Sequence, residues 1–221
     1  FLIESGGSVN EATNDGYTPL LTASCNGHLE VVKFLIESEG SVNKADDNGK
    51  RPLYAASKNG HLEVVKFLIE SGGSVNEATN DGVTPLYMAS KNGHLEVVKF
   101  LIESGGSVNE SDNNGCTPLY IASSNGHLEV IKFLIASGGS VNESDNNGCT
   151  PLHAASYNGH LEVVKFLIES GGSVNHVANN NKGITPLHAA SKYGHLEVVK
   201  VLIAYGANYD YKNKYGKTSV D

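Results

Sequence analysis

Apolar residues recur along this chain at spacings typical of amphipathic helices. In the stretch LEVVKFLIES (95–104), Leu95 and Val98 fall on one side of a helix, whereas Glu96 and Lys99 fall on the other. The Gly that follows provides a left-handed residue that can end the helix. The pattern therefore predicts a helix of about ten residues with its aliphatic side in a core and its charged side in water.

A second, shorter helix is predicted just before it, in GVTPLYMASKNG (82–93). Thr84 is a good N-cap, and Pro85 suits the first helical position, where its missing N–H is not needed. Gly93 ends this helix after about eight residues. The following segment GSVNESDNNG (106–115) is rich in Gly, Asn, Asp and Ser, which predicts a turn or a finger-like loop.

The helix, turn, helix, loop unit repeats along the whole chain, because glycines recur every 33 residues with a single spacing of 35. They are Gly16, Gly49, Gly82, Gly115, Gly148, Gly183 and Gly216. The predicted domain is a single array of complete repeats with a partial repeat at each end. Its parts are residues 1–15, 16–48, 49–81, 82–114, 115–147, 148–182, 183–215 and 216–221.

Helices this short are marginal in water when isolated, so each unit must bury its apolar side on its neighbours. A period of this length is typical of a stacked solenoid. We therefore predict an elongated all-α solenoid of six complete helix pairs.

The residues also resemble a known family. GITPLHAASKYGHLEVVKVLIAYGAN (183–208) is similar to the ankyrin repeat, and the resemblance covers the whole chain. It implies a curved α-solenoid with protruding β-turn fingers, and a role in protein binding through the concave groove and the finger tips. The sequence departs from the family pattern where Arg51 replaces the capping Thr, and where Glu39 stands in place of a helix-ending Gly. The His of T-P-L-H is replaced in four units, by Leu21, Tyr54, Tyr87 and Tyr120.

Composition narrows the classes of function. The formal net charge of −8 argues against a nucleic-acid partner, which clustered Lys and Arg would bind. The uninterrupted apolar runs are far too short for a membrane span, which argues against a membrane partner. The odd, sparse set of Cys25, Cys116 and Cys149 favours a reducing compartment, and we expect a cytoplasmic protein with free thiols.

No chemical motif stands out from the repeat. The histidines of the G-H-L-E turns recur once per repeat, on the order of 8–10 Å apart, so they cannot converge on one metal ion. The Glu and Lys of the second helices have the spacing of exposed surface pairs. Every candidate Ser and His belongs to the repeating scaffold, and the glycines of ESGG end helices rather than cradle phosphates. The sequence predicts no catalytic residue, metal or cofactor, and hence no enzyme.

Differences between repeats indicate where a protein partner binds. They concentrate just after the repeat Gly, in the first helix and in the loops. The predicted protein-binding residues are Tyr17, Lys50, Arg51, Tyr54, Lys58, Tyr87, Lys91, Tyr120, Tyr157, Lys192 and Tyr193. Tyr54, Tyr87 and Tyr120 have a second interpretation, which is that they hydrogen-bond the adjoining loop.

Loop charges form a second pattern. Acidic residues line the fingers, at Glu11, Asp15, Asp46, Asp47, Glu77, Asp81, Glu110, Asp112, Glu143 and Asp145. Lys182, Lys212 and Lys214 reverse the sign near the C-terminus. A partner with a basic stretch beside an acidic end would complement this pattern, and the association should slow as salt rises.

The alternative function is a structural spacer or a self-associating segment of a longer ankyrin array in a larger, even enzymatic, protein. Leu2 and Ile3 match the end of a second helix, and residues 217–221 stop where the next first helix would begin. Either the chain is a fragment of a longer array or flanking residues were lost. We expect an N-terminal edge that is less stable than the middle and that can stack on another molecule.

Overall fold

The structure is a computed structural model that describes residues 8–179 and 182–219. The described residues form twelve α-helices and no strand, which confirms the predicted all-α fold of helix pairs. They fall into two compact units, with the border between Ser107 and Val108. Unit 1 contains α1 (Pro19–Cys25), α2 (Leu29–Glu37), α3 (Pro52–Lys58), α4 (Leu62–Glu70), α5 (Pro85–Lys91) and α6 (Leu95–Glu103). Unit 2 contains α7 (Pro118–Asn125), α8 (Leu128–Ala136), α9 (Pro151–Asn158), α10 (Leu161–Glu169), α11 (Pro186–Lys192) and α12 (Leu196–Ala204).

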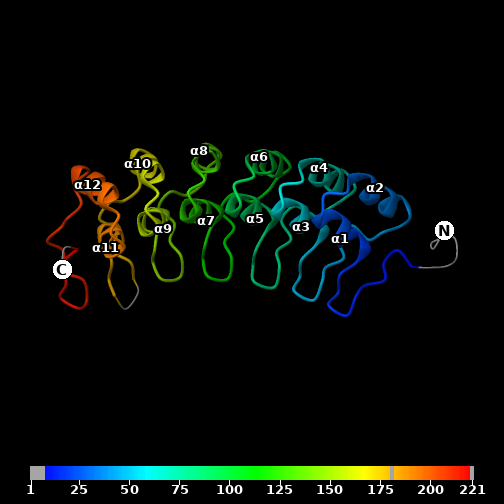
Figure 1. Ribbon diagram of the computed structural model, residues 1–221, viewed down its shortest axis with the longest axis horizontal. Helices are drawn as coiled ribbons and strands as arrows, with labels where there is room; N and C mark the ends of the chain where they lie inside the picture. Colours follow the sequence, from blue (N-terminus) through cyan, green and yellow to red (C-terminus); the bar gives the residue numbers. More distant parts are fainter. Residues whose placement is uncertain (1–7, 180–181, 220–221) are drawn as a thin grey trace. The chain divides into compact units, whose positions relative to one another are not determined.

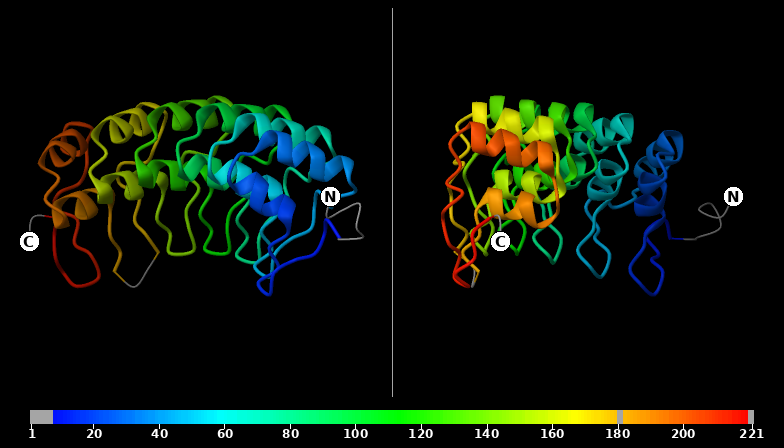
Figure 2. Two further views of the ribbon diagram at one scale, coloured as in Figure 1. Left: turned by 45° about the vertical axis from the view of Figure 1, so that its right-hand side comes forward. Right: turned by 60° about the vertical axis from the view of Figure 1, so that its left-hand side comes forward.

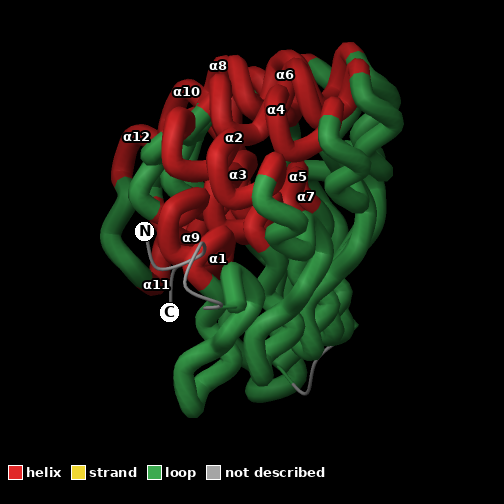
Figure 3. Tube along the Cα trace, turned by 90° about the vertical axis from the view of Figure 1, so that its right-hand side faces the viewer, coloured by secondary structure: helices red, strands yellow, loops and turns green. Residues whose placement is uncertain are grey.

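Each unit has two helix layers and a row of loops (Figure 1). In unit 1, the first helices α1, α3 and α5 pack on one another, and the second helices α2, α4 and α6 do the same. Unit 2 repeats this order with α7, α9 and α11 in one layer and α8, α10 and α12 in the other. Within each unit the finger loops project from the first-helix layer, away from the second helices (Figure 2). Figure 3 shows the helices and the loops separated in this way.

The predicted caps explain where the first helices begin. Thr18, Thr84 and Thr117 each accept a hydrogen bond from the backbone N–H three residues later, and Pro occupies the next position. Arg51 holds the N-cap position of α3, but its side chain makes no such capping hydrogen bond. Gly60 follows α3 with φ of 77°, in the left-handed region.

The core lies between the two layers. Leu53 and Leu86 of the first helices are buried, and so are Val65 and Leu68 of α4. Ala56 on α3 is fully buried, as is its equivalent in the following repeat, and these small residues let neighbouring first helices approach closely. Burial of a Leu or Val side chain contributes roughly 1.5–3 kcal/mol, so stability comes mainly from packing between pairs.

Histidines of the G-H-L-E turns join consecutive repeats. In unit 1, His61 Nε2 donates to the carbonyl of Cys25 at 3.0 Å, and His94 Nε2 donates to the carbonyl of Lys58 at 3.0 Å. The ring also fills the space beside the preceding turn, because a Cβ on Gly60 would lie 2.6 Å from His94 Nδ1. These side chains therefore connect consecutive repeats, as expected of turn residues that belong to the scaffold.

The asparagine of each V-N pair makes a second junction that sequence reasoning did not identify. Asn43 Nδ2 donates to the carbonyl of Gly72 at 2.9 Å, and Asn43 Oδ1 accepts from Ser74 N at 2.9 Å. The same two bonds join Asn142 to Gly171 and Ser173 in unit 2. One amide side chain thus satisfies two backbone groups of the following repeat.

Glu39 occupies the predicted helix-ending position with φ of 67°. A non-Gly residue in this region costs roughly 1–2 kcal/mol. Leu2 and Ile3, which the sequence assigns to a leading partial repeat, lie outside the described residues. Among the helices that are described, none has the length and apolar character needed to cross a bilayer.

Candidate functional site

The predicted binding residues differ in exposure. Tyr17, Tyr157 and Tyr193 are 39%, 46% and 41% exposed, and Lys58, Lys91 and Lys192 are also exposed. These six residues are called the helix-one surface, and each unit carries its own part of it. Lys50, Arg51 and Tyr120 are partly buried, whereas Tyr54 and Tyr87 are buried.

The residue two positions before the Gly that follows each first helix has separate roles for its backbone and its side chain. The carbonyl of Lys58 accepts from His94 Nε2 at 3.0 Å and from Asn92 Nδ2 at 3.0 Å. The carbonyl of Tyr157 likewise accepts from His195 Nε2 at 2.9 Å. Any residue supplies this carbonyl, so the carbonyl bond does not depend on the side chain. Two side chains at this position also take part, because Cys25 Sγ accepts from Asn59 Nδ2 at 3.3 Å and Ser124 Oγ accepts from Asn158 Nδ2 at 3.2 Å. This position holds Cys25, Lys58, Lys91, Ser124, Tyr157 and Lys192 in successive repeats.

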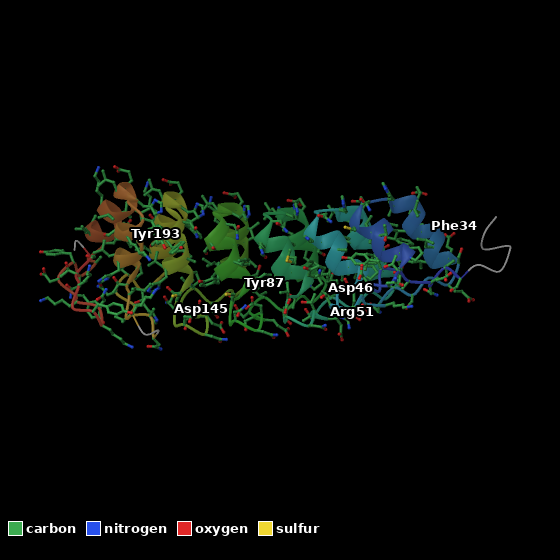
Figure 4. The ribbon with its side chains drawn as sticks, turned by 60° about the horizontal axis from the view of Figure 1, so that its bottom comes forward. Phe34, Asp46, Arg51, Tyr87, Asp145 and Tyr193 are labelled. Atoms are coloured by element: carbon green, nitrogen blue, oxygen red, sulfur yellow. The ribbon has the colours of Figure 1, made fainter. Side chains whose placement is uncertain are left out.

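Arg51 is held by the next finger loop. Its guanidinium donates to the carbonyl of Ala78 at 3.1 Å and to the carbonyl of Gly49 at 3.2 Å. It also forms an ion pair with Glu77 at 3.1 Å. Arg51 thus connects the base of one finger to the next, which gives it a scaffold role besides the predicted partner contact (Figure 4).

The fourth position of the T-P-L-H motif reaches the following finger loop. Tyr120 donates from its hydroxyl to Asp145 Oδ2 at 3.4 Å, and His188 Nε2 donates to the carbonyl of Lys217 at 3.2 Å. His153 Nε2 donates to the carbonyl of Ile184 at 3.2 Å, while its Nδ1 accepts from Thr150 N. For Tyr120, the contact matches the second interpretation of this position, which is a hydrogen bond to the adjoining loop.

His153 needs a neutral ring. The side chain is 2% exposed, and burial lowers the pKa of His153 to about 4, although the bond to the Ile184 carbonyl favours the charged form. Both ring nitrogens are engaged in the neutral tautomer, since one donates and the other accepts. Protonation would add a buried charge and remove the acceptor that Thr150 N uses.

Several predicted loop acids are bound to their own loops. Asp46 Oδ1 accepts from Asn48 N at 2.9 Å and from Lys50 N at 2.8 Å, and Asp145 Oδ1 accepts from Asn147 N and Cys149 N. Asp46 is 5% exposed, and its Oδ2 has no hydrogen-bond partner. By repeat register, the side chain that should reach this oxygen is Leu21, which has no donor.

The cysteines are free and partly buried. Burial, together with the nearby carboxylates of Asp112 and Asp145, raises the pKa of Cys116 to about 12. Burial also raises the pKa of Cys149 to about 11. Both thiols stay protonated near neutral pH, so neither is an activated nucleophile.

Unit 2 brings two of the predicted aromatic residues together. The rings of Tyr157 and Tyr193 lie 4.1 Å apart between centroids, with an interplanar angle of 53°. Lys192 Nζ lies 5.1 Å from the centroid of the Tyr193 ring, within the range of a cation–π contact. The hydrogen bond between the two tyrosines raises the pKa of Tyr157 and lowers the pKa of Tyr193. Sequence reasoning selected these residues separately and did not predict their contact.

The second helices present a different surface. Lys66 and Glu63 form an exposed ion pair at 2.7 Å, and so do Lys99 and Glu96. Equivalent pairs recur on the other second helices. Each such pair contributes only a few tenths of a kcal/mol, so this surface is a solvated helix face.

Apolar side chains are also exposed at one edge of each unit. Val31 and Phe34 of α2 are 48% and 56% exposed, whereas the equivalent Val64 is 2% exposed (Figure 4). In unit 2, Leu196 and Ile203 of α12 are 61% and 42% exposed. These edges are where stacking on another molecule would take place, and self-association stays a prediction.

The helix pairs, capped turns and inter-repeat bonds define an all-α repeat protein. A model of ankyrin repeats in three copies matches residues 1–79, 72–145 and 137–213. The fold also matches the crystal structure of the human ASB11 ankyrin repeat domain, with 33% identity and a TM-score of 0.84. That match covers 93% of this chain and 91% of the human one. A comparison with curated protein sequences finds no match.

The chain belongs to the ankyrin repeat family. Ankyrin repeats are generally modules for protein–protein interaction, and domains of this kind are typically scaffolds without catalytic activity.

The unpartnered oxygen of Asp46 leads to a stability prediction. Replacing Leu21 by Tyr should place a hydroxyl where Tyr120 has one, within reach of Asp46 Oδ2. Leu21→Phe is the matched control, since it adds the same ring without a donor. We expect Leu21→Tyr to exceed Leu21→Phe in free energy of unfolding by about 1 kcal/mol, measured by urea denaturation. Equal stability of the two variants would contradict this account of Asp46.

His153 leads to a prediction of pH dependence. Its folded pKa of about 4 lies below the ordinary value of 6.5, so the unfolded chain binds more protons between these values. The contribution is fully present above pH 6.5 and is lost as pH falls to about 4. Relative to His153→Tyr, which carries the residue found at this position in three other repeats, the native chain should lose about 2–3 kcal/mol of unfolding free energy from pH 7 to 4.5. Parallel pH profiles of the two proteins would exclude the buried neutral imidazole.

Proposed function

We propose that this chain is a protein–protein interaction scaffold that binds its partner through the helix-one surface and the adjoining finger tips. The observation that carries the proposal is the divided role of the residue two positions before the Gly that follows a first helix. At Lys58 and Tyr157 the carbonyl holds the next repeat while the side chain is exposed. The side chains of the equivalent Lys91 and Lys192 are exposed as well.

Residue chemistry supports the same surface. Tyr and Arg are over-represented among residues that carry large binding energies, and Tyr17, Tyr157 and Tyr193 expose large rings at little conformational cost. Lys50 and Arg51 lie beside the finger loops and extend the proposed contact toward the tips. Tyr54, Tyr87 and Tyr120 are assigned to the base of this surface, where their burial leaves smaller areas for a partner.

The second helices offer less to a partner. Their lysines are paired with glutamates one turn away, and the same residues recur in nearly every repeat. A surface that repeats in this way cannot distinguish one part of the array from another. The helix-one surface differs from repeat to repeat and can therefore give a partner both position and orientation.

The proposal is tested with a partner captured from cell extract by the intact chain and then purified. Substitution of Lys58, Lys91, Tyr157 and Lys192 by Ala should weaken its binding by about thirtyfold or more, because these side chains are the proposed contacts. Isothermal titration calorimetry gives the affinity, and circular dichroism checks that helical content is unchanged.

The matched control changes the same residue types on the second-helix side: Lys66, Lys99, Lys200 and Tyr205 to Ala. We expect this variant to bind within about twofold of the native chain, since exposed ion pairs contribute little. If the first variant stays folded and keeps its affinity while the control loses it, the binding site lies on the second-helix surface.

A further inference from the structure

Unit 2 contains an open groove bordered by α9, α11, α12 and the finger loops. Its volume is about 1410 Å³. Tyr157, Tyr193 and Lys192 line it from the helix side, and Asn146, Asn147 and Asn213 line it from the loops. Lys182 and Lys217 add two more cationic side chains. The groove thus combines an aromatic pair with amide and ammonium donors.

The electrostatic character of the groove is opposite to that of the whole chain. The chain has a net charge of −8, yet among the described residues that line the groove none is Asp or Glu. Between residues 182 and 218, two acidic residues stand against six lysines. One of the two, Glu197, pairs with Lys200 at 2.7 Å on α12. The groove is therefore a local cationic surface on an anionic protein.

The aromatic pair departs from the repeat pattern at one position. Asn59 and Asn92 donate from their side chains to the carbonyl at the end of the preceding first helix. In the last complete repeat Tyr193 takes this position, and its ring packs on Tyr157 instead. The exchange replaces a polar bridge with two half-exposed rings, which offer a flat apolar surface and hydroxyl groups to a bound chain.

These observations indicate the chemistry of the partner. The inference drawn from them rests on the proposed function. We propose that the unit 2 groove binds an acidic peptide segment of a partner protein. Asp and Glu carboxylates of that segment pair with Lys192, Lys182 and Lys217. The Tyr157–Tyr193 pair packs against its backbone and apolar side chains, and Asn146, Asn147 and Asn213 supply further donors. Charge complementarity of this kind also speeds association and makes it sensitive to salt.

The test uses the full chain and a displayed library of random twelve-residue peptides. Selected peptides are synthesised with a fluorescent label, and their affinities are measured by anisotropy at low and moderate salt. We expect the selected peptides to be enriched in Asp and Glu, and their affinity to fall as salt rises. Variants of each peptide with Gln and Asn in place of the acids should bind about tenfold more weakly.

Two double variants identify the groove. Lys192→Gln with Tyr193→Asn removes one cation and one ring, and gives the last complete repeat the Asn that the other repeats use. Lys200→Gln with Tyr205→Asn makes the same chemical change on the second-helix side of the same unit. The acidic peptides should bind the first variant about tenfold more weakly and the second within about twofold. Circular dichroism and thermal unfolding confirm that both variants fold.

The outcomes separate this proposal from the proposed function. If the selected peptides are neutral or basic and bind the Lys192→Gln, Tyr193→Asn variant more weakly, the proposal of an acidic partner is wrong and the scaffold function still stands. If acidic peptides bind both double variants equally, the proposal that the unit 2 groove binds them is also wrong. If no peptide distinguishes the helix-one surface from the second-helix surface, the proposed function fails together with the inference.

Discussion

The structure depends on the hydrogen bonds that connect each repeat to the one before it. Every first helix ends after about two turns and leaves carbonyl groups without an intrahelical partner. The following repeat supplies the donors, as His94 Nε2 does for the carbonyl of Lys58. Asn43 adds a two-point bond in the opposite direction, to Gly72 and Ser74. Because helix pairs this short are marginal alone, these junctions and the apolar contacts beside them make stability a property of the stack.

The same junctions leave the proposed binding surface free to differ between repeats. They use backbone carbonyls and a few fixed side chains, so the bonds at Lys58 and Tyr157 do not depend on the side chains of these two residues. A repeat can therefore change its exposed chemistry without changing its fold. Unit 2 contains an example, because Tyr193 stands where the other repeats have an Asn, and its ring packs on Tyr157. His153 and Arg51 instead belong to the scaffold, because the side chain of each makes two hydrogen bonds to backbone groups.

Much of the fold could be predicted from the sequence, because its signals are local and repeated. Thr84, Pro85 and Gly93 mark the ends of a helix by rules that act within a few residues. The candidate surface could be predicted only in part, since exposure depends on neighbours that periodicity does not show. Tyr54 and Tyr157 share a residue type, but the first is buried and the second is exposed. The Asn43 junction and the Tyr157–Tyr193 contact join residues about 30 positions apart, where only coordinates place the atoms. The Asp46 oxygen without a partner depends in the same way on the residues that surround it in space.

The most direct test of this account is the free energy of unfolding of His94→Ala, measured by urea denaturation beside Glu96→Ala. Both residues lie at the start of the same helix, but only His94 donates to the preceding repeat and fills the space beside Gly60. The account predicts a loss of about 1–3 kcal/mol for His94→Ala and less than about 0.5 kcal/mol for Glu96→Ala. A loss for His94→Ala that is no larger than that for Glu96→Ala would contradict the claim that these junctions hold the array together.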